Sequence, residues 1–203
     1  MNIFDIFKKV KTEPLPKYPP IKIEEIPAAS GILFYGGNKL TELAGNRLYK
    51  FKYRPPAFHA AFYIGDPEPG MFLNVGKFKT IQDISAEFRS TRRIDIIIYK
   101  NIDVDQRRRL AKLAIMDASK PKVGVSLPDY GITDYLRFGL RFLRPSKKDF
   151  CSENVCELLA AESVIVSSNK PVDTAPWDLQ EFAEANPESC EIRTLWIGPD
   201  FKK

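Results

Sequence analysis

Cys151 is the residue of this chain with the clearest capacity for nucleophilic chemistry. It follows Phe150 and opens the segment CSENVCELLAAESV, whose apolar residues recur at helical spacing. At the first turn of a helix, the macrodipole and the free backbone N–H groups stabilise a thiolate over a thiol. Asp149 or Ser152 can cap that turn, and the same N–H groups can bind an oxyanion. A cysteine at a helix start is more often structural than catalytic, so a catalytic role requires a partner.

The general base for such a thiol has one candidate, His59, because the chain of 203 residues holds a single histidine. His59 lies in the run FHAAFYIG, which reads as a strand. Alternation along that strand gives one apolar face, made of Phe58, Ala60, Phe62 and Ile64. His59 belongs to the other face. A lone histidine on a strand is usually a surface or a satisfied core residue, so this assignment depends on its pairing with a cysteine.

Asn74, in the next apolar run MFLNVG, is the third candidate. The turn-forming sequence DPEPG separates the two runs and predicts a hairpin. If the hairpin matches the core faces of its strands, Asn74 lies on the same face as His59, either opposite it or on a diagonal. An asparagine amide there can hold the imidazole in the tautomer that serves the thiol. The pattern predicts a catalytic group of Cys151, His59 and Asn74.

These residues need a scaffold, and the hydrophobic pattern predicts an α+β domain over residues 28–203. Its sheet is expected to be antiparallel, with helices packed on it. Strands are expected at 31–35, 58–65, 71–76, 93–100 and 190–196. Helices are expected at 80–88, 104–118, 132–143, 151–164 and 176–185, with a helix or turn at 40–49.

Residues 1–27 are expected to form an N-terminal arm ahead of this domain. A short amphipathic helix is expected at residues 2–11. The proline-rich stretch that follows, TEPLPKYPPIKIEEIP, is expected to run extended over the surface. Two interpretations of the arm stay open at this point. It is a docking peptide for a protein partner or a membrane, or it is a tail folded back on its own domain.

Composition limits the class of protein. Hydrophobic residues make up 44% and charged residues 28%, as in ordinary globular domains. No apolar run approaches the roughly 20 residues that cross a bilayer. The start, MNIFDIFKKVK, does not have the pattern of a secretory signal. We therefore expect a protein made and kept in the cytoplasm unless another machine carries it out.

Charge and cysteine count exclude several kinds of site. The net charge of +5 suits an anionic partner such as a cell wall. The basic clusters are scattered and no nucleic-acid motif accompanies them, so no nucleic acid is expected. Cys151, Cys156 and Cys190 are too few for a disulfide framework and indicate a reducing compartment. With one histidine, no Cys/His zinc cluster can form by the usual spacings. We expect neither a metal nor a cofactor.

Five short motifs are together similar to those of one known family. They are SGILFY at 30–35, HAAFYIG at 59–65, FLNVG around Asn74, FCSE at 150–153 and TAPWDL at 174–179. In this order, and over roughly residues 29–182, the chain resembles the circularly permuted, NlpC-type papain-like cysteine hydrolases. That family includes the YiiX-like proteins and, more distantly, the lecithin:retinol acyltransferase-like enzymes. No single motif is specific, but the set at these intervals is fairly specific.

The resemblance implies a circularly permuted papain-like fold with Cys151 as nucleophile, His59 as base and Asn74 as the residue that orients His59. In the family the third residue is often Glu or His, so Asn74 is a departure. The family's tyrosine before the nucleophile corresponds to Tyr130 only if the preceding segment is lengthened, and simple packing is its alternative role. Tyr130 and Ser152 are the residues expected at the oxyanion or substrate.

The reaction implied is attack of the Cys151 thiolate on an amide or ester carbonyl. The best-known substrates of NlpC-type enzymes are peptide bonds of bacterial cell walls, so we expect a peptidoglycan endopeptidase or amidase. A basic protein with an N-terminal arm and no export signal suits a bacteriophage-encoded, virion-associated enzyme. Two alternatives stay open. One is a lipid or thioester acyltransferase of the same fold. The other is a non-enzymatic structural or adaptor module of a virion, with the arm as its functional part.

Overall fold

An antiparallel sheet forms the centre of the structure, a computed structural model that describes residues 13–36, 53–54, 57–75, 79–89, 91–119, 151–171 and 174–199. Every neighbouring pair of strands in this sheet is antiparallel. Within the described residues the order across the sheet is β6 (Lys79–Asp83), β5 (Met71–Val75), β4 (Ala57–Tyr63), β2 (Ser30–Tyr35), β7 (Arg93–Tyr99) and β8 (Cys190–Ile197). The predicted α+β class, with an antiparallel sheet and helices, is confirmed.

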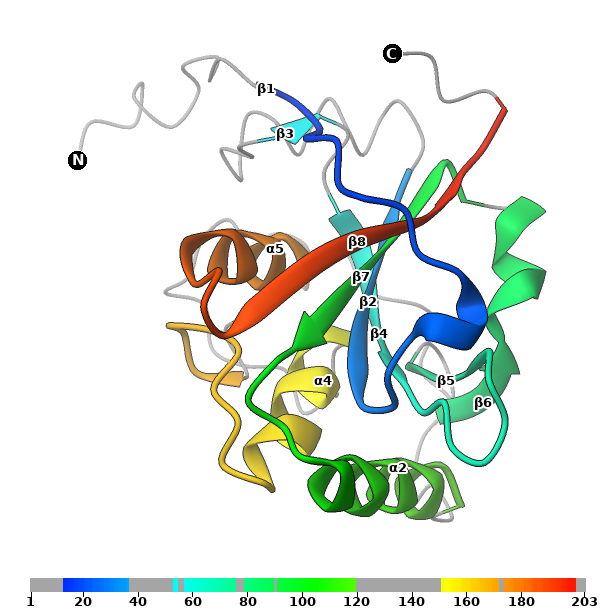
Figure 1. The fold of residues 1–203 in the computed structure, drawn as a ribbon, viewed down its shortest axis with the longest axis vertical. Helices are drawn as coiled ribbons and strands as arrows, with labels where there is room; N and C mark the ends of the chain where they lie inside the picture. Colours follow the sequence, from blue (N-terminus) through cyan, green and yellow to red (C-terminus); the bar gives the residue numbers. More distant parts are fainter. Residues whose placement is uncertain are drawn as a thin grey trace, which may run out of the picture.

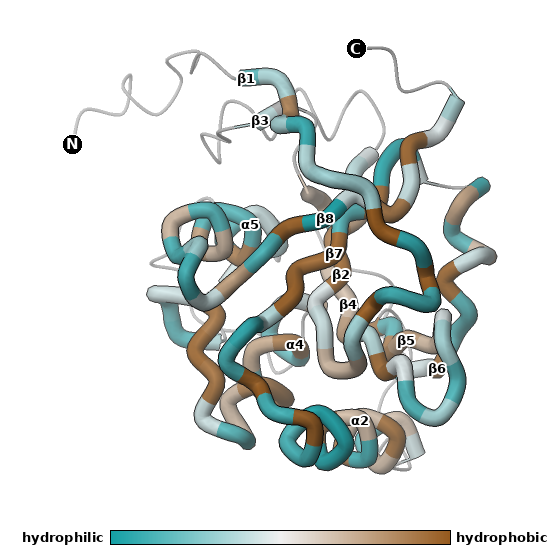
Figure 2. Tube along the Cα trace, in the orientation of Figure 1, coloured by the Kyte–Doolittle hydropathy of each residue, from teal (hydrophilic) through white to brown (hydrophobic). Residues whose placement is uncertain are grey.

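Helices α2 (Val104–Ser119), α4 (Cys151–Ala160) and α5 (Pro176–Ala185) pack on one face of this sheet (Figure 1). Side chains alternate between the two faces of each strand, and those on the helical face build the larger core. Figure 2 shows hydrophobic residues along the central strands β2 and β7. The core joins strand and helix residues, among them Leu33, Phe62, Leu73, Leu110, Val155 and Leu179.

The opposite face of the sheet carries a second core, which the chain before β2 helps to cover. Ile32 and Ile94 are completely buried there, and Ile26 packs with them. Phe88 and Trp196 stack on each other at the border of this core, with ring centroids 4.7 Å apart. The central strands β2 and β7 are therefore buried on both faces, so their register is strongly specified.

Residues 13–27 of the arm fold back onto the domain (Figure 1). The Thr194 N–H of β8 donates to the carbonyl of Pro19 at 2.9 Å, and the Ile21 N–H donates to the Thr194 carbonyl at 3.0 Å. Tyr18 donates its hydroxyl to Glu184 of α5 at 2.5 Å. Of the two interpretations left open by the sequence, residues 13–27 therefore follow the second, a tail folded back on its own domain. It also holds β1 (Glu13–Pro14), paired with β3 (Tyr53–Arg54), and the 3-10 helix η2 (Ile23–Glu25).

The prediction of a helix at 80–88 is wrong for residues 80–83. Residues up to Asp83 form strand β6, and only the rest forms a helix, the 3-10 helix η3 (Ile84–Arg89). Asn74 of β5 pairs with Thr80, and Phe72 pairs with Gln82. Tertiary pairing with β5 therefore overrides a local pattern that resembles a helix.

The core position predicted for Phe58 is also wrong, although the strand around it is present. Phe58 is 43% exposed. The pairing of β2 with β4 slips at this point, because Phe34 lies opposite His59 whereas Tyr35 lies opposite Ala57. Such a bulge leaves Phe58 outside the regular ladder and turns its side chain outward. The irregularity directly precedes His59.

The other predicted strands and the helices over 104–118 and 176–185 are present within a few residues of their expected ends. The helix expected at 151–164 ends at Ala160, and Ser163 follows with a positive φ of 62°. The elements predicted at 2–11, 40–49 and 132–143 lie outside the described residues.

Asp117, in the last turn of α2, ties α4 to β6. Its Oδ2 accepts a hydrogen bond from Nδ2 of Asn154 in α4 at 3.0 Å and forms an ion pair with Nζ of Lys79 in β6 at 2.7 Å. Asn154 is 2% exposed, and the other two side chains are largely covered. Charge-assisted hydrogen bonds away from water are stronger than exposed ones. Asp117 therefore holds the helix that carries Cys151 against the edge of the sheet.

We predict that Asp117→Ala lowers the free energy of unfolding by about 2 kcal/mol, because the buried Asn154 amide loses its acceptor. Asp105→Ala on the same helix is the matched control. Its ion pair with Arg108 is 3.6 Å long and largely exposed, so its loss should cost less than about 1 kcal/mol. Urea unfolding followed by circular dichroism measures both, and equal losses would contradict the role given to Asp117.

Candidate active site

Cys151 is the first residue of α4 and is 5% exposed. The inward residues Val155 and Leu159 are buried in the larger core and fix the helix against the sheet. The hydroxyl of Ser152 donates to the carbonyl oxygen of Thr174 at 2.6 Å, which ties the start of α4 to the segment before α5. The thiol therefore lies at a helix start, where backbone N–H groups and the helix dipole favour negative charge.

The imidazole of His59 reaches Cys151 from β4. The two side chains form a hydrogen bond, and the charge of Cys151 acts on the ring. Helix α4 packs against β4, which brings together two residues that are far apart in the sequence. The ring is half-buried and lies against Phe34 of β2, with ring centroids 5.3 Å apart. The first two predicted site residues are thus in contact.

Asn74 contacts the ring of His59 as well, so Cys151, His59 and Asn74 form a chain of contacts. Nε2 of His59 lies 2.8 Å from Oδ1 of Asn74. Because a carbonyl oxygen only accepts, Nε2 carries the hydrogen and donates it. Nδ1 is then the ring nitrogen left for Cys151, and in the neutral ring it can accept the thiol proton. The predicted contact between His59 and Asn74 is present.

The sequence allowed Asn74 to lie either directly opposite His59 or on a diagonal, and the register of the hairpin decides between these two arrangements. Phe62 of β4 pairs with Leu73 of β5, and the same register, extended by one residue, puts Asn74 opposite Ala61. His59 stands two residues further along the same face. The asparagine and the histidine are therefore diagonal neighbours, a separation that long or aromatic side chains can span.

The pKa of His59 is raised above its ordinary value. Burial of the ring lowers the pKa. The charge and hydrogen bond of Cys151, the hydrogen bond to Asn74 and the charge of Glu87 raise it by more. The site therefore stabilises the imidazolium more than water does, and the imidazolium is the form that pairs with a thiolate.

Two polar residues near His59 were missed in the sequence. Nδ2 of Asn74 donates to Oε1 of Gln82 in β6 at 2.9 Å, and Glu87 in η3 acts on His59 through its charge. Both lie in the segment predicted as a helix. A strand assignment there would have found Gln82, because strand alternation places it on the same face as Thr80, the partner of Asn74.

Of the two residues expected at the oxyanion or substrate, Ser152 is among the described residues and Tyr130 is not. The Ser152 hydroxyl is completely buried and donates to Thr174. It supports the start of α4, and the oxyanion or substrate role expected of Ser152 stays a prediction. Tyr130, like the cap candidate Asp149, lies outside the described residues.

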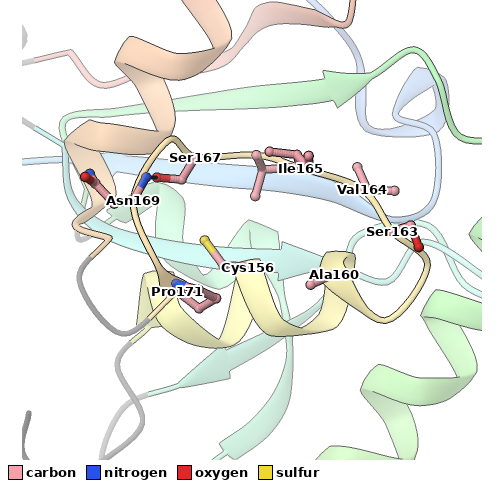
Figure 3. A pocket seen from close by; sticks show the side chains of 9 residues that line it. Cys156, Ala160, Ser163, Val164, Ile165, Ser167, Asn169 and Pro171 are labelled. Atoms are coloured by element: carbon pink, nitrogen blue, oxygen red, sulfur yellow. Dashed lines mark hydrogen bonds between the residues drawn. The ribbon is translucent and has the colours of Figure 1, made fainter.

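Cys156 and Cys190 are unlike Cys151 because no histidine reaches them. Both are buried free thiols, and burial raises the pKa of Cys156 to about 12 and that of Cys190 to about 11. Cys156 lines a mostly apolar pocket of about 350 Å³ between α4 and the segment that follows it (Figure 3). Ala160, Val164 and Ile165 also line it. These two thiols stay protonated and act as small apolar side chains.

Among the described residues, no group of three or more His, Cys, Asp or Glu side chains could hold a metal ion. No helix in that part of the chain is long and apolar enough to span a membrane. No protein-family model matches the sequence, and no curated protein matches it.

We predict that His59 titrates with a midpoint above the ordinary value of about 6.5, and that Cys151→Ala and Asn74→Ala each lower this midpoint. The thiolate and the Asn74 carbonyl both stabilise the imidazolium, so removing either one favours the neutral ring. Nuclear magnetic resonance of ¹⁵N-histidine-labelled protein measures the midpoint without ambiguity, because the chain has one histidine.

Asn101→Ala is the matched control for the asparagine variant. Asn101 is exposed and donates to Ser189, so the His59 midpoint should stay at the wild-type value. An unchanged midpoint in Cys151→Ala would contradict the coupling between the thiol and the imidazole.

Proposed function

We propose that this protein is a cysteine hydrolase of amide bonds, with Cys151 as nucleophile, His59 as general acid and base, and Asn74 as the residue that orients His59. The observation that carries the proposal is the contact chain from Cys151 through His59 to Asn74. These side chains come from α4, β4 and β5. A thiol that serves only to fill a core needs no such chain, and Cys156 and Cys190 lack it.

The reaction begins with the Cys151 thiolate attacking the carbonyl carbon of the substrate. The backbone N–H of Cys151, at the start of α4, binds the oxyanion that forms. His59, as the imidazolium, gives its Nδ1 proton to the leaving amine, and a thioester remains on Cys151. Water then attacks the thioester while His59 takes the water's proton. Cys151 leaves as thiolate with the imidazolium restored, and the acid product is released.

The circularly permuted papain-like fold is part of the same proposal. In its support, the histidine strand precedes the cysteine helix in the sequence, and α4 packs on β4 of an antiparallel sheet. The TAPWDL segment has a defined place in this arrangement. Thr174 accepts from Ser152 at the start of α4, and Asp178 accepts from the Ala175 N–H at the start of α5.

The proposed substrate is a peptide bond of the bacterial cell wall, as the resemblance implies. The net charge of +5 suits that anionic polymer. We place the enzyme with a bacteriophage, made in the host cytoplasm and associated with the virion. The proposed substrate rests on the motifs, because a fold alone does not determine a substrate. The proposed source rests on the net charge and the N-terminal arm.

We predict that the protein releases peptide fragments from purified peptidoglycan and that Cys151→Ala abolishes the release. His59→Ala should lower kcat by about 10²- to 10⁴-fold, the usual contribution of a general acid and base. Cys156→Ala is the matched control, because it makes the same substitution on the same helix and should retain activity. Chromatography and mass spectrometry of the fragments measure the rates.

Digestion by Cys151→Ala would overturn the assignment. A wild-type protein that leaves peptidoglycan intact but gains the mass of an acyl group on Cys151 from an added lipid or thioester donor would assign an acyltransferase instead.

A further inference from the structure

A polar side chain beyond the three proposed catalytic residues extends the contact chain to the edge of the sheet. Asn74 uses both ends of its amide: Oδ1 accepts from Nε2 of His59 at 2.8 Å, and Nδ2 donates to Oε1 of Gln82 at 2.9 Å. His59, Asn74 and Gln82 come from the successive strands β4, β5 and β6. Gln82 pairs with Phe72, two residues before Asn74, so this contact is also diagonal across neighbouring strands.

The orientation of the Asn74 amide decides which proton His59 can move. With Oδ1 toward the ring, Nε2 must carry hydrogen, and Nδ1 is free to take the thiol proton. With the amide turned over, Nδ2 faces the ring. Nε2 then becomes an acceptor, and the only hydrogen of the neutral ring sits on Nδ1. In that state the base cannot accept a proton from Cys151. The turned amide also opposes the imidazolium, because two N–H groups would face each other.

Nothing in an asparagine side chain itself selects one of these orientations, because its two ends are nearly equal in size. An acceptor on the far side makes the selection. Gln82 presents Oε1, and not its own Nε2, to Asn74, and a carbonyl oxygen cannot donate. This end of the Gln82 amide therefore stabilises the Asn74 orientation in which Nδ2 points toward Gln82 and Oδ1 toward His59.

Strand β6 is held near both of its ends, which keeps Gln82 in place. Before Gln82, Nζ of Lys79 pairs with Asp117 of α2 at 2.7 Å. After it, the Ile84 N–H donates to the carbonyl of Gly70 at 2.9 Å. Between these points the backbone of β6 forms a regular ladder with β5. An edge strand fixed in this way can position a side chain that acts through another residue.

We propose that Gln82 is a positioning residue that selects the Asn74 orientation, and through it the Nε2–H tautomer and the imidazolium of His59. The proposal rests on the proposed function for its importance in catalysis, but the hydrogen-bond relay itself can be measured without any substrate.

The test uses three variants of the full chain and the single histidine as reporter. Gln82→Leu removes the acceptor, and Gln82→Glu keeps an acceptor that cannot donate and adds a negative charge. Thr80→Val is the matched control on the same strand and face, opposite Asn74. Circular dichroism and urea unfolding establish that each variant is folded. The tautomer and titration midpoint of His59 are then read from ¹⁵N-histidine spectra.

We expect Gln82→Leu to populate the Nδ1–H tautomer and to lower the His59 midpoint. Gln82→Glu should keep the Nε2–H tautomer and raise the midpoint, and Thr80→Val should match the wild type. The rate of Cys151 alkylation by iodoacetamide at neutral pH should fall about threefold to tenfold in Gln82→Leu, as for the loss of one hydrogen bond, and should recover in Gln82→Glu. A merely structural role would not move the midpoint in opposite directions.

The proposal is overturned if Gln82→Leu keeps the wild-type tautomer and midpoint, or if Thr80→Val changes them as much. Failure of the proposed function gives a different result. In that case Cys151→Ala leaves the His59 midpoint unchanged, while Gln82→Leu still changes the tautomer.

Discussion

The contact between the Cys151 thiol and the His59 ring is the interaction on which the rest of the structure depends. Neither the thiol nor the ring obtains its environment from its neighbours in the sequence alone. The thiol needs the start of α4, and the ring needs strand β4 with its irregular pairing just before His59. The two meet only because α4 packs on the sheet through buried residues such as Val155 and Leu159. The chemistry of the site is therefore a product of the tertiary fold.

Polar contacts on both sides of this pair hold it in position. Ser152 and Asn154 fix α4 through Thr174 and Asp117. On the side of the ring, the amide of Asn74 joins His59 to the edge strand. Asp117 also pairs with Lys79 on that strand. The helix that carries the thiol and the strands that orient the ring thus share one supporting residue, which limits their movement relative to each other.

The sequence predicted much of the site because strand alternation is a strict rule. The alternation of side chains along the two strands was enough to predict that Asn74 lies on the same face as His59, and the diagonal hydrogen bond between them agrees with this prediction. The same reasoning failed where a local pattern misled it. Treating 80–88 as a helix hid Gln82, whose strand is defined by pairing with β5. It also failed at Phe58, because a bulge depends on the neighbouring strand. The buried role of Ser152 depends on Thr174, a contact between distant segments that no local pattern encodes.

The rate of Cys151 alkylation as a function of pH, compared between the native and the urea-unfolded protein, tests most directly whether the fold creates the reactive pair. Mass spectrometry distinguishes Cys151 from Cys156 and Cys190 in the same sample. Our account predicts that native Cys151 reacts at a pH too low for the unfolded thiol, and that this advantage disappears on unfolding. Native Cys151 that reacts only where unfolded thiols do, or as slowly as Cys156, would contradict it.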